Sequence, residues 1–248
     1  MHSEPGFDLI TLADKPVARE LVVGLAGPDL AALSAIDYLI EQSGAELVGH
    51  VRTVGLPDVA VIKDGSPRQP LRIYTDHTDG LTILIGEAII PIRLVDQFAT
   101  ALGHFIEAFQ SITVLHAAPF PHREEEHIPF LAATDGYRDA TQGMSLNALP
   151  TGLLDGFPGE ALLRAMNGSY PPCGIVITPA HMPGPDINAG VTLIEGMNTV
   201  LGRSVDVSGL QERAEQMENH FAGLADRITS LRENEMSTRD FPEDRMYM

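Results

Sequence analysis

The last three residues of the chain, Met246, Tyr247 and Met248, combine apolar side chains, an aromatic ring and a terminal carboxylate. A terminal carboxylate is a charge that no internal segment offers, and a partner protein can capture it with a lysine or with a nest of backbone N–H groups. The tyrosine adds a flat apolar face with a polar tip. We expect the three residues to bind a partner from the end of a polar tail, and the alternative is a frayed terminus without a partner.

A short glycine-containing segment, residues 24–27, joins an apolar run to an amphipathic stretch. Such a loop can hold a phosphate at a helix N-terminus. This one has only two glycines, lacks the dinucleotide-binding fingerprint, and is followed by Asp29 where an anion would lie. The two lysines of the chain, Lys15 and Lys63, precede the first strong strand and lie at a β turn, so neither is well placed for a nucleotide. A tight turn is expected, with a phosphate site as the alternative.

Two other segments contain side chains of reactive types. Residues 122–127, His-Arg-Glu-Glu-Glu-His, could hold a divalent ion, but consecutive glutamates point in different directions and a solvated loop is expected. The single cysteine, Cys173, opens an apolar run, where a buried thiol is expected rather than a nucleophile. No spacing of Ser, His and Asp suggests a triad. We therefore predict no catalytic residue, no cofactor and no metal site.

The composition is strongly acidic, with 34 Asp and Glu against 16 Lys and Arg and a formal net charge of −18. Nucleic acid and anionic membranes need clustered positive charge, so neither is an expected partner. Evenly spread acidity with two lysines is typical of halophilic proteins, because a Debye length of about 3 Å at 1 M salt screens the repulsion between carboxylates. The acidic amino terminus and the lack of long apolar runs predict a cytoplasmic protein without a signal peptide or membrane span.

The apolar periodicity predicts alternating strands and helices. Two strand–helix–strand units in succession favour one sheet with helices on both faces. Asp29 and Asp186 are predicted to cap the helices that follow them. Strands are predicted at about residues 7–12, 21–26, 47–53, 59–63, 71–74, 81–87, 111–117, 130–133 and 174–178, an extended piece at 145–149, and helices at 30–42, 92–109, 158–166 and 183–201.

The most regular feature is a predicted final helix that begins at Ser208, which forms a capping box with Gln211. Its apolar residues recur at alternating intervals of four and three as far as Leu231, which is typical of helix-on-helix packing. Such a helix spans roughly 35 Å. It can pack against its own body or form the seam of an oligomer. Beyond residue 234 the chain is polar and too poor in apolar residues to fold.

The order and spacing of several motifs resemble one known family. The first motif is the run 22–27, followed by a helix whose last part is residues 35–40. The next are the turn at Asp64 and Gly65 before residues 73–74, and the strand end at 85–87. The last is Pro-Gly-Pro-Asp at 183–186, which is followed by an apolar helix, by Val205 and Asp206, and by the final helix. Over about residues 5 to 232 the chain resembles the proteasome assembly chaperone family of archaea, which is similar to the second eukaryotic proteasome assembly chaperone.

This resemblance implies a single α/β domain over residues 1–232 and a flexible tail over 233–248. The implied domain is a three-layer sandwich with a mostly parallel or mixed central sheet flanked by helices, similar to the nucleoside-phosphorylase-like fold. The family also implies a homo-oligomer without catalytic activity.

Certain archaeal members of this family end in a hydrophobic residue, a tyrosine and any residue, and Met246, Tyr247 and Met248 match that motif. In proteasome activators the motif enters pockets between α subunits of the proteasome core, where the terminal carboxylate pairs with a lysine. The resemblance therefore implies a proteasome assembly chaperone or adaptor that binds core α subunits through its tail. The alternative is a nucleotide-binding protein or an enzyme with ATP-grasp-like or phosphorylase-like activity.

Overall fold

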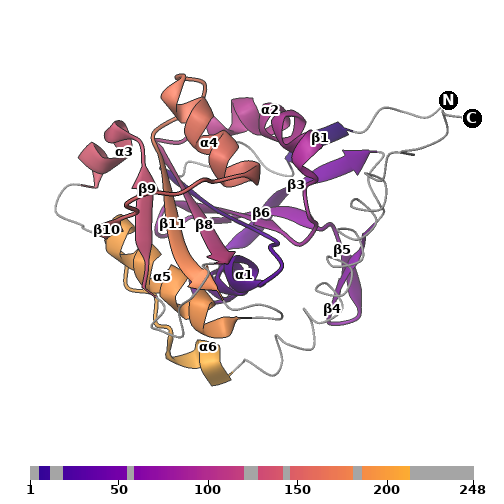
Figure 1. Cartoon of the computed structure of the whole chain (residues 1–248). Coiled ribbons are helices and arrows are strands. Elements are labelled where there is room, and N and C mark those ends of the chain that lie inside the picture. Colours follow the sequence, from indigo (N-terminus) through magenta and orange to yellow (C-terminus); the bar gives the residue numbers. More distant parts are fainter. Residues whose placement is uncertain are drawn as a thin grey trace, which may run out of the picture.

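The computed structural model describes residues 6–11, 19–54, 59–119, 128–141, 146–180 and 186–212 (Figure 1). In this part of the chain, a nine-stranded mixed sheet has the order β1-β3-β6-β7-β2-β8-β11-β9-β10, and a hairpin of β4 and β5 stands beside it. The strands are β1 (Gly6–Thr11), β2 (Glu20–Leu25), β3 (Glu46–Val54), β4 (Val61–Lys63), β5 (Ser66–Arg68), β6 (Leu71–Asp76), β7 (Leu81–Gly86), β8 (Ser111–Pro119), β9 (Phe130–Ala133), β10 (Asn147–Ala148) and β11 (Cys173–Ala180). The helices are α1 (Ala31–Ser43), the 3-10 turn η1 (Ile92–Leu94), α2 (Val95–Ile106), α3 (Asp135–Ala140), α4 (Gly156–Met166), α5 (Ile187–Leu201) and α6 (Ser208–Glu212).

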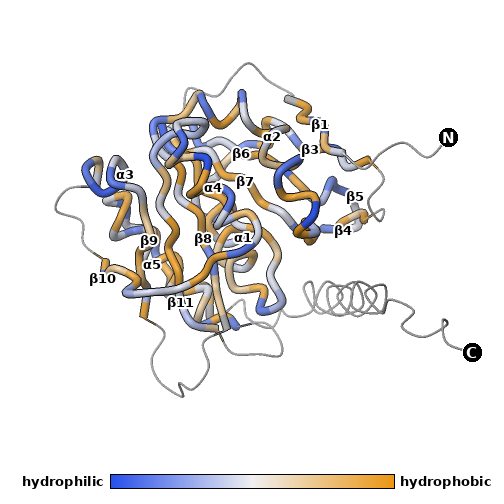
Figure 2. Tube along the Cα trace, turned by 45° about the horizontal axis from the view of Figure 1, so that its top comes forward, coloured by the Kyte–Doolittle hydropathy of each residue, from blue (hydrophilic) through white to orange (hydrophobic). Residues whose placement is uncertain are grey.

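The centre of the sheet is parallel. Strand β2 pairs in parallel with β7 on one side and with β8 on the other, and β8 pairs in parallel with β11. Antiparallel strands extend the sheet outward, β6, β3 and β1 beyond β7, and β9 beyond β11. The central strands are apolar along most of their length (Figure 2), as expected for strands that are buried on both faces. The predicted mixed sheet is therefore confirmed.

Helices cover both faces of the sheet, and each face has its own apolar core. Helices α1 and α5 pack over the face that carries Val22 and Ile83, whereas α2 and α4 pack over the face that carries Val23 and Leu84. Neighbouring residues belong to different cores because successive side chains of a strand point to opposite faces. Burying one such aliphatic side chain contributes about 1.5–3 kcal/mol. The likeness to the nucleoside-phosphorylase-like fold stays a prediction.

The structure contains two elements that the periodicity did not predict. Strand β5 has the sequence Ser-Pro-Arg and forms because the turn at Asp64 and Gly65, both with positive φ, folds it back onto β4. Helix α3 is a short segment in which Tyr137 is the buried residue, so no apolar stripe marks it. Both elements are too short to show an apolar period in the sequence.

The predicted helix caps have different outcomes. Asp186 is confirmed, because its Oδ1 accepts a hydrogen bond from Ala189 N at 3.0 Å. The prediction that Asp29 is the N-cap of α1 is wrong: the N-cap residue is Leu30, which adopts a left-handed conformation with φ of 56°. Ser208 is the first residue of α6, and its hydroxyl donates to Asp206 Oδ2 at 2.8 Å; the predicted capping box stays a prediction, because the side chain of Gln211 lies outside the described part of the chain. The rest of the predicted final helix and the domain boundary at residue 232 lie outside the described residues.

Candidate functional site

The predicted partner-binding residues Met246, Tyr247 and Met248 lie outside the described part of the chain. The same holds for Lys15 and for residues 122–127, so their predicted roles stay predictions. Within the described ranges, no three His, Cys, Asp or Glu side chains converge as the ligands of a metal ion would. In the same ranges, none of the helices combines the length and the hydropathy that a membrane crossing requires.

Residues 24 and 25 end β2, and the tight turn to α1 follows at residues 27–30, where Leu30 N donates to Gly27 O. Gly24 allows close packing there, because a Cβ at this position would lie 2.2 Å from Ile36 Cγ1 on α1. The Asp29 carboxylate is buried and accepts a hydrogen bond from Ala31 N at 2.9 Å. A carboxylate of the protein thus occupies the start of the helix, where a bound phosphate would need the same N–H groups. The turn was predicted correctly.

Lys63 is the one lysine among the residues that the structure describes, and it joins the β4–β5 hairpin to α1. Its Nζ lies 3.0 Å from Asp37 Oδ1 and 3.2 Å from Glu41 Oε1. The ammonium charge is therefore neutralised by two carboxylates of the same helix. This position does not suit a phosphate ligand, and it weakens the alternative of nucleotide binding.

Cys173 is fully buried at the beginning of β11. Burial raises the pKa of its thiol to about 12. The thiolate is the nucleophilic form of cysteine, so a thiol with so high a pKa is unreactive at neutral pH. This environment agrees with the predicted structural role.

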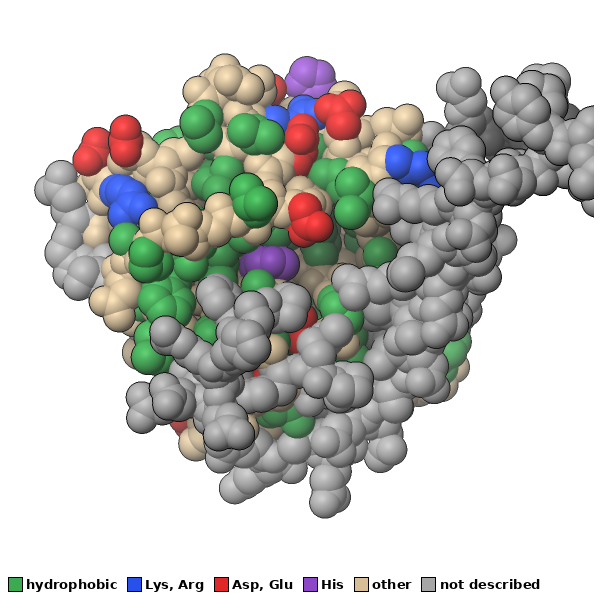
Figure 3. Space-filling view, in the orientation of Figure 1, with side chains coloured by type: hydrophobic (Ala, Val, Ile, Leu, Met, Phe, Trp, Pro, Cys, Tyr) green, Lys and Arg blue, Asp and Glu red, His purple; other side chains and the backbone are tan. Residues whose placement is uncertain are grey.

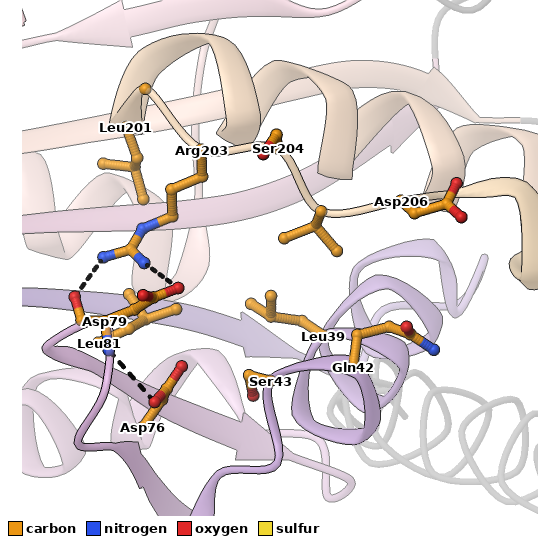
Figure 4. A pocket seen from close by; sticks show the side chains of 12 residues that line it. Leu39, Gln42, Ser43, Asp76, Asp79, Leu81, Leu201, Arg203, Ser204 and Asp206 are labelled. Atoms are coloured by element: carbon orange, nitrogen blue, oxygen red, sulfur yellow. Dashed lines mark hydrogen bonds and ion pairs between the residues drawn. The ribbon is translucent and has the colours of Figure 1, made fainter.

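A cavity of about 490 Å³ lies between the end of α1, the β6–β7 turn and the loop after α5 (Figure 4). Two of the polar side chains around it, Arg203 and Asp76, form hydrogen bonds with neighbouring parts of the chain. Arg203 Nη2 donates to Glu20 Oε2 at 2.9 Å and to the carbonyl oxygen of Asp79 at 3.1 Å. Asp76 Oδ1 accepts from Thr78 N at 2.8 Å and closes the β6–β7 turn.

Asp206, on the opposite wall of this cavity, is also engaged. Hydrogen bonds from the backbone N–H and the hydroxyl of Ser208 lower the pKa of the Asp206 carboxyl group. The contacts around the first cavity thus join the loop after α5 to the β6–β7 turn and to the start of β2, and they engage the charged groups Arg203, Asp76 and Asp206 in structural bonds.

A second cavity, of about 470 Å³, lies between β3, β6 and the β4–β5 hairpin. We call it the hairpin cavity. In the sheet register, Leu47 and His50 of β3 lie opposite Tyr74 and Arg72 of β6. The lining residues are Leu47, His50, Pro67, Arg68, Gln69, Arg72 and Tyr74.

Arg72 is held rigidly at the wall of the hairpin cavity, and its side chain is only 3% exposed. Its Nη1 lies 2.5 Å from Glu87 Oε2 and donates to Gln69 O at 2.6 Å, and its Nε donates to Tyr74 Oη at 3.0 Å. Burial alone lowers the pKa of Arg72, but the charge of Glu87 and the hydrogen bonds outweigh it, so the pKa is raised. The guanidinium group is therefore permanently charged.

Helix α4 carries exposed apolar side chains on its outer surface. Leu163 is 56% exposed and Met166 is 71% exposed, and Leu153 in the preceding loop is fully exposed. In Figure 3 apolar side chains gather over the region of α4, with acidic side chains between them. Nothing in the described structure covers this surface.

The nine-stranded mixed sheet with helices on both faces defines the chain as an α/β protein. A model of the PAC2 family matches residues 21–225, and the chain therefore belongs to the PAC2 family. This result confirms the family that the sequence motifs indicated.

Solved structures share this fold at low sequence identity. Pyrococcus furiosus PbaA, an archaeal homolog of proteasome-assembly chaperone, is 20% identical with a TM-score of 0.80, over 91% of this chain and 99% of that chain. A protein of unknown function from Thermoplasma acidophilum is 21% identical with a TM-score of 0.77, over 88% and 90%. Pyrococcus furiosus PbaB, an archaeal proteasome activator, is 16% identical with a TM-score of 0.67, over 88% and 98%. None of the curated proteins matches the chain.

Proposed function

We propose that the protein is a non-catalytic proteasome assembly chaperone or adaptor that binds proteasome core α subunits through residues 246–248. The observation that carries the proposal is the ending Met-Tyr-Met on a chain of the PAC2 family. The fold likeness to PbaA, a homolog of proteasome-assembly chaperone, and to PbaB, a proteasome activator, supports it.

Each residue of the tail has a distinct role in this proposal. Tyr247 anchors the tail, Met246 fills an adjacent apolar site, and the carboxylate of Met248 pairs with a lysine of the α subunit. A contact of three residues is weak by itself. A cytoplasmic homo-oligomer presents several tails at once, which raises their effective concentration and can strengthen binding by about 10²–10⁴-fold.

The test is co-purification of the proteasome core particle with the intact protein, with a variant that lacks residues 246–248, and with Tyr247→Ala. We expect both variants to lose the core particle, because the aromatic anchor and the carboxylate act together. Phe241→Ala is the matched control, since it removes an aromatic side chain from the same tail outside the motif. Circular dichroism and gel filtration should show an unchanged fold and oligomer, and retained binding after truncation would overturn the proposal.

A further inference from the structure

The hairpin cavity is basic, although the chain as a whole has a net charge of −18. Two arginines and a histidine line it, Arg68, Arg72 and His50, and among the described residues that line it there is no Asp or Glu. The first cavity has the opposite character, with three aspartates and one arginine. The described lining of the hairpin cavity is thus basic in an otherwise acidic protein.

The arginines of the hairpin cavity have donors to spare. A guanidinium group has five N–H donors. The hydrogen bonds of Arg72 to described residues use Nη1 and Nε, so its Nη2 donates to none of the described residues. The carboxylate of Glu87 offsets the charge of Arg72. Arg68 forms no ion pair with any described residue, in contrast to Arg52 and Arg164, so it supplies the uncompensated positive charge.

The other lining residues are apolar or aromatic apart from Gln69. Leu47 is 46% exposed, and Pro67 and the ring of Tyr74 lie beside it. Ligand sites have volumes of about 300–1,000 Å³ with a few polar groups that fix the ligand's orientation. A cavity of about 470 Å³ with this lining suits a carboxylate attached to a small apolar body.

We infer that the hairpin cavity is a carboxylate-binding site and that its occupant is the C-terminal segment of this chain, residues 246–248. That segment has two methionines and a tyrosine, and the inference takes the carboxylate of Met248 from the proposed function. Glu243 and Asp244 precede it and complement the charge of Arg68. Residues 213–248 follow the last described residue, so the segment is covalently linked to the domain that carries the cavity. Tethering keeps the tail at a millimolar effective concentration, so a weak site is sufficient.

A docked tail is withheld from other partners. This consequence rests on the proposed function, because the same three residues would have to leave the hairpin cavity before they enter a socket on the proteasome. The docking itself does not depend on proteasome binding. The two can therefore be tested separately.

The direct test is fluorescence anisotropy with a labelled peptide of residues 241–248 and a protein that ends at Arg245. We expect the peptide with a free carboxylate to bind at least tenfold more tightly than the same peptide with a C-terminal amide, because charge-assisted hydrogen bonds to arginine are lost in the amide. The full-length protein should bind the peptide about tenfold more weakly than the truncated one, since its own tail competes. Equal affinities for the acid and the amide, or for the two proteins, would overturn the inference.

A charge reversal locates the site. Arg68→Glu should weaken binding of the acid peptide at least tenfold, whereas Arg52→Glu, on β3 outside the cavity, should leave it unchanged. Thermal melting checks that both variants are folded. Equal effects of the two substitutions would place the peptide elsewhere and refute the inference. Co-purification with the core particle separates the outcomes: a tail that binds the core particle but not the cavity refutes the docking alone, and the reverse result refutes the proposed function alone.

Discussion

The ammonium group of Lys63 donates to both carboxylate oxygens of Asp37, at 3.0 Å and 3.2 Å. The pair joins the β4–β5 hairpin to α1, although the two residues are 26 positions apart in the chain. Because the same hairpin carries Arg68, this contact also fixes one wall of the hairpin cavity.

Lys63→Met is therefore expected to lower the free energy of unfolding by about 1–2 kcal/mol, because it leaves the mostly buried Asp37 carboxylate without its partner. Urea denaturation measures the change. Lys63→Arg keeps the charge and should have a smaller effect. An unaltered urea midpoint for Lys63→Met would show that the pair does not stabilise the hairpin.

The buried pair of Arg72 and Glu87 should behave differently from a surface ion pair. Arg72→Met should cost about 3–5 kcal/mol, because it leaves a charged carboxylate in the interior. The double variant Arg72→Met, Glu87→Leu removes both charges and should recover much of that loss. Chemical denaturation of the three proteins compares them, and a double variant no more stable than Arg72→Met alone would contradict this account.

Gly24 and Gly103 form a matched pair of tests, because an added Cβ would clash at the first and meet open space at the second. Gly24→Ala should destabilise the protein by about 1–3 kcal/mol, because the new Cβ would lie 2.2 Å from Ile36 Cγ1 and 2.9 Å from Ala32 O. Gly103 lies in α2 with nothing within 4 Å of an added Cβ. Gly103→Ala should stabilise the protein by up to about 1 kcal/mol, since alanine favours the helix. Shifts of the same sign in thermal melting would refute the packing argument at Gly24.

The stability of the protein should depend on pH through His116. Burial lowers the pKa of His116, against the opposing charge of Asp155. The unfolded chain therefore binds a proton at a higher pH than the folded protein does. The stabilising contribution is complete above the ordinary pKa of about 6.5 and is lost as the pH falls toward the lowered value.

His116→Gln removes this titration. Between pH 7.5 and pH 5, the free energy of unfolding of the unmodified protein should fall more steeply than that of the variant. Urea denaturation at several pH values measures both slopes. Parallel slopes would mean that His116 titrates alike in the folded and unfolded states.

The central strands could be predicted from the sequence because burial on both faces gives them continuous apolar runs, as around Val22 and Ile83. The start of α1 was placed one residue too early, because the left-handed Leu30 is not a residue type that announces this conformation. Strand β5 was missed because its three residues contain no apolar pattern and pair only through the turn before them.

The hairpin cavity was not predictable for a different reason. It exists because His50 and Arg72 become neighbours in the register of β3 and β6 and because the hairpin brings Arg68 beside them. Register and the position of a hairpin are set by the whole sheet. No local pattern in the sequence marks the cavity, whereas the tail motif was visible because its three residues are contiguous.

The position of β2 in the sheet also governs how a new molecule reaches its native state. This strand is made early but lies between β7 and β8, which the ribosome produces much later. Until residue 86 has emerged, the segment Glu20–Leu25 has neither neighbour, and until residue 119 has emerged it lacks β8, so one of its edges stays unpaired. We therefore expect slow maturation and a tendency to self-associate during synthesis, so a protein proposed to assist the assembly of others has a demanding assembly problem of its own.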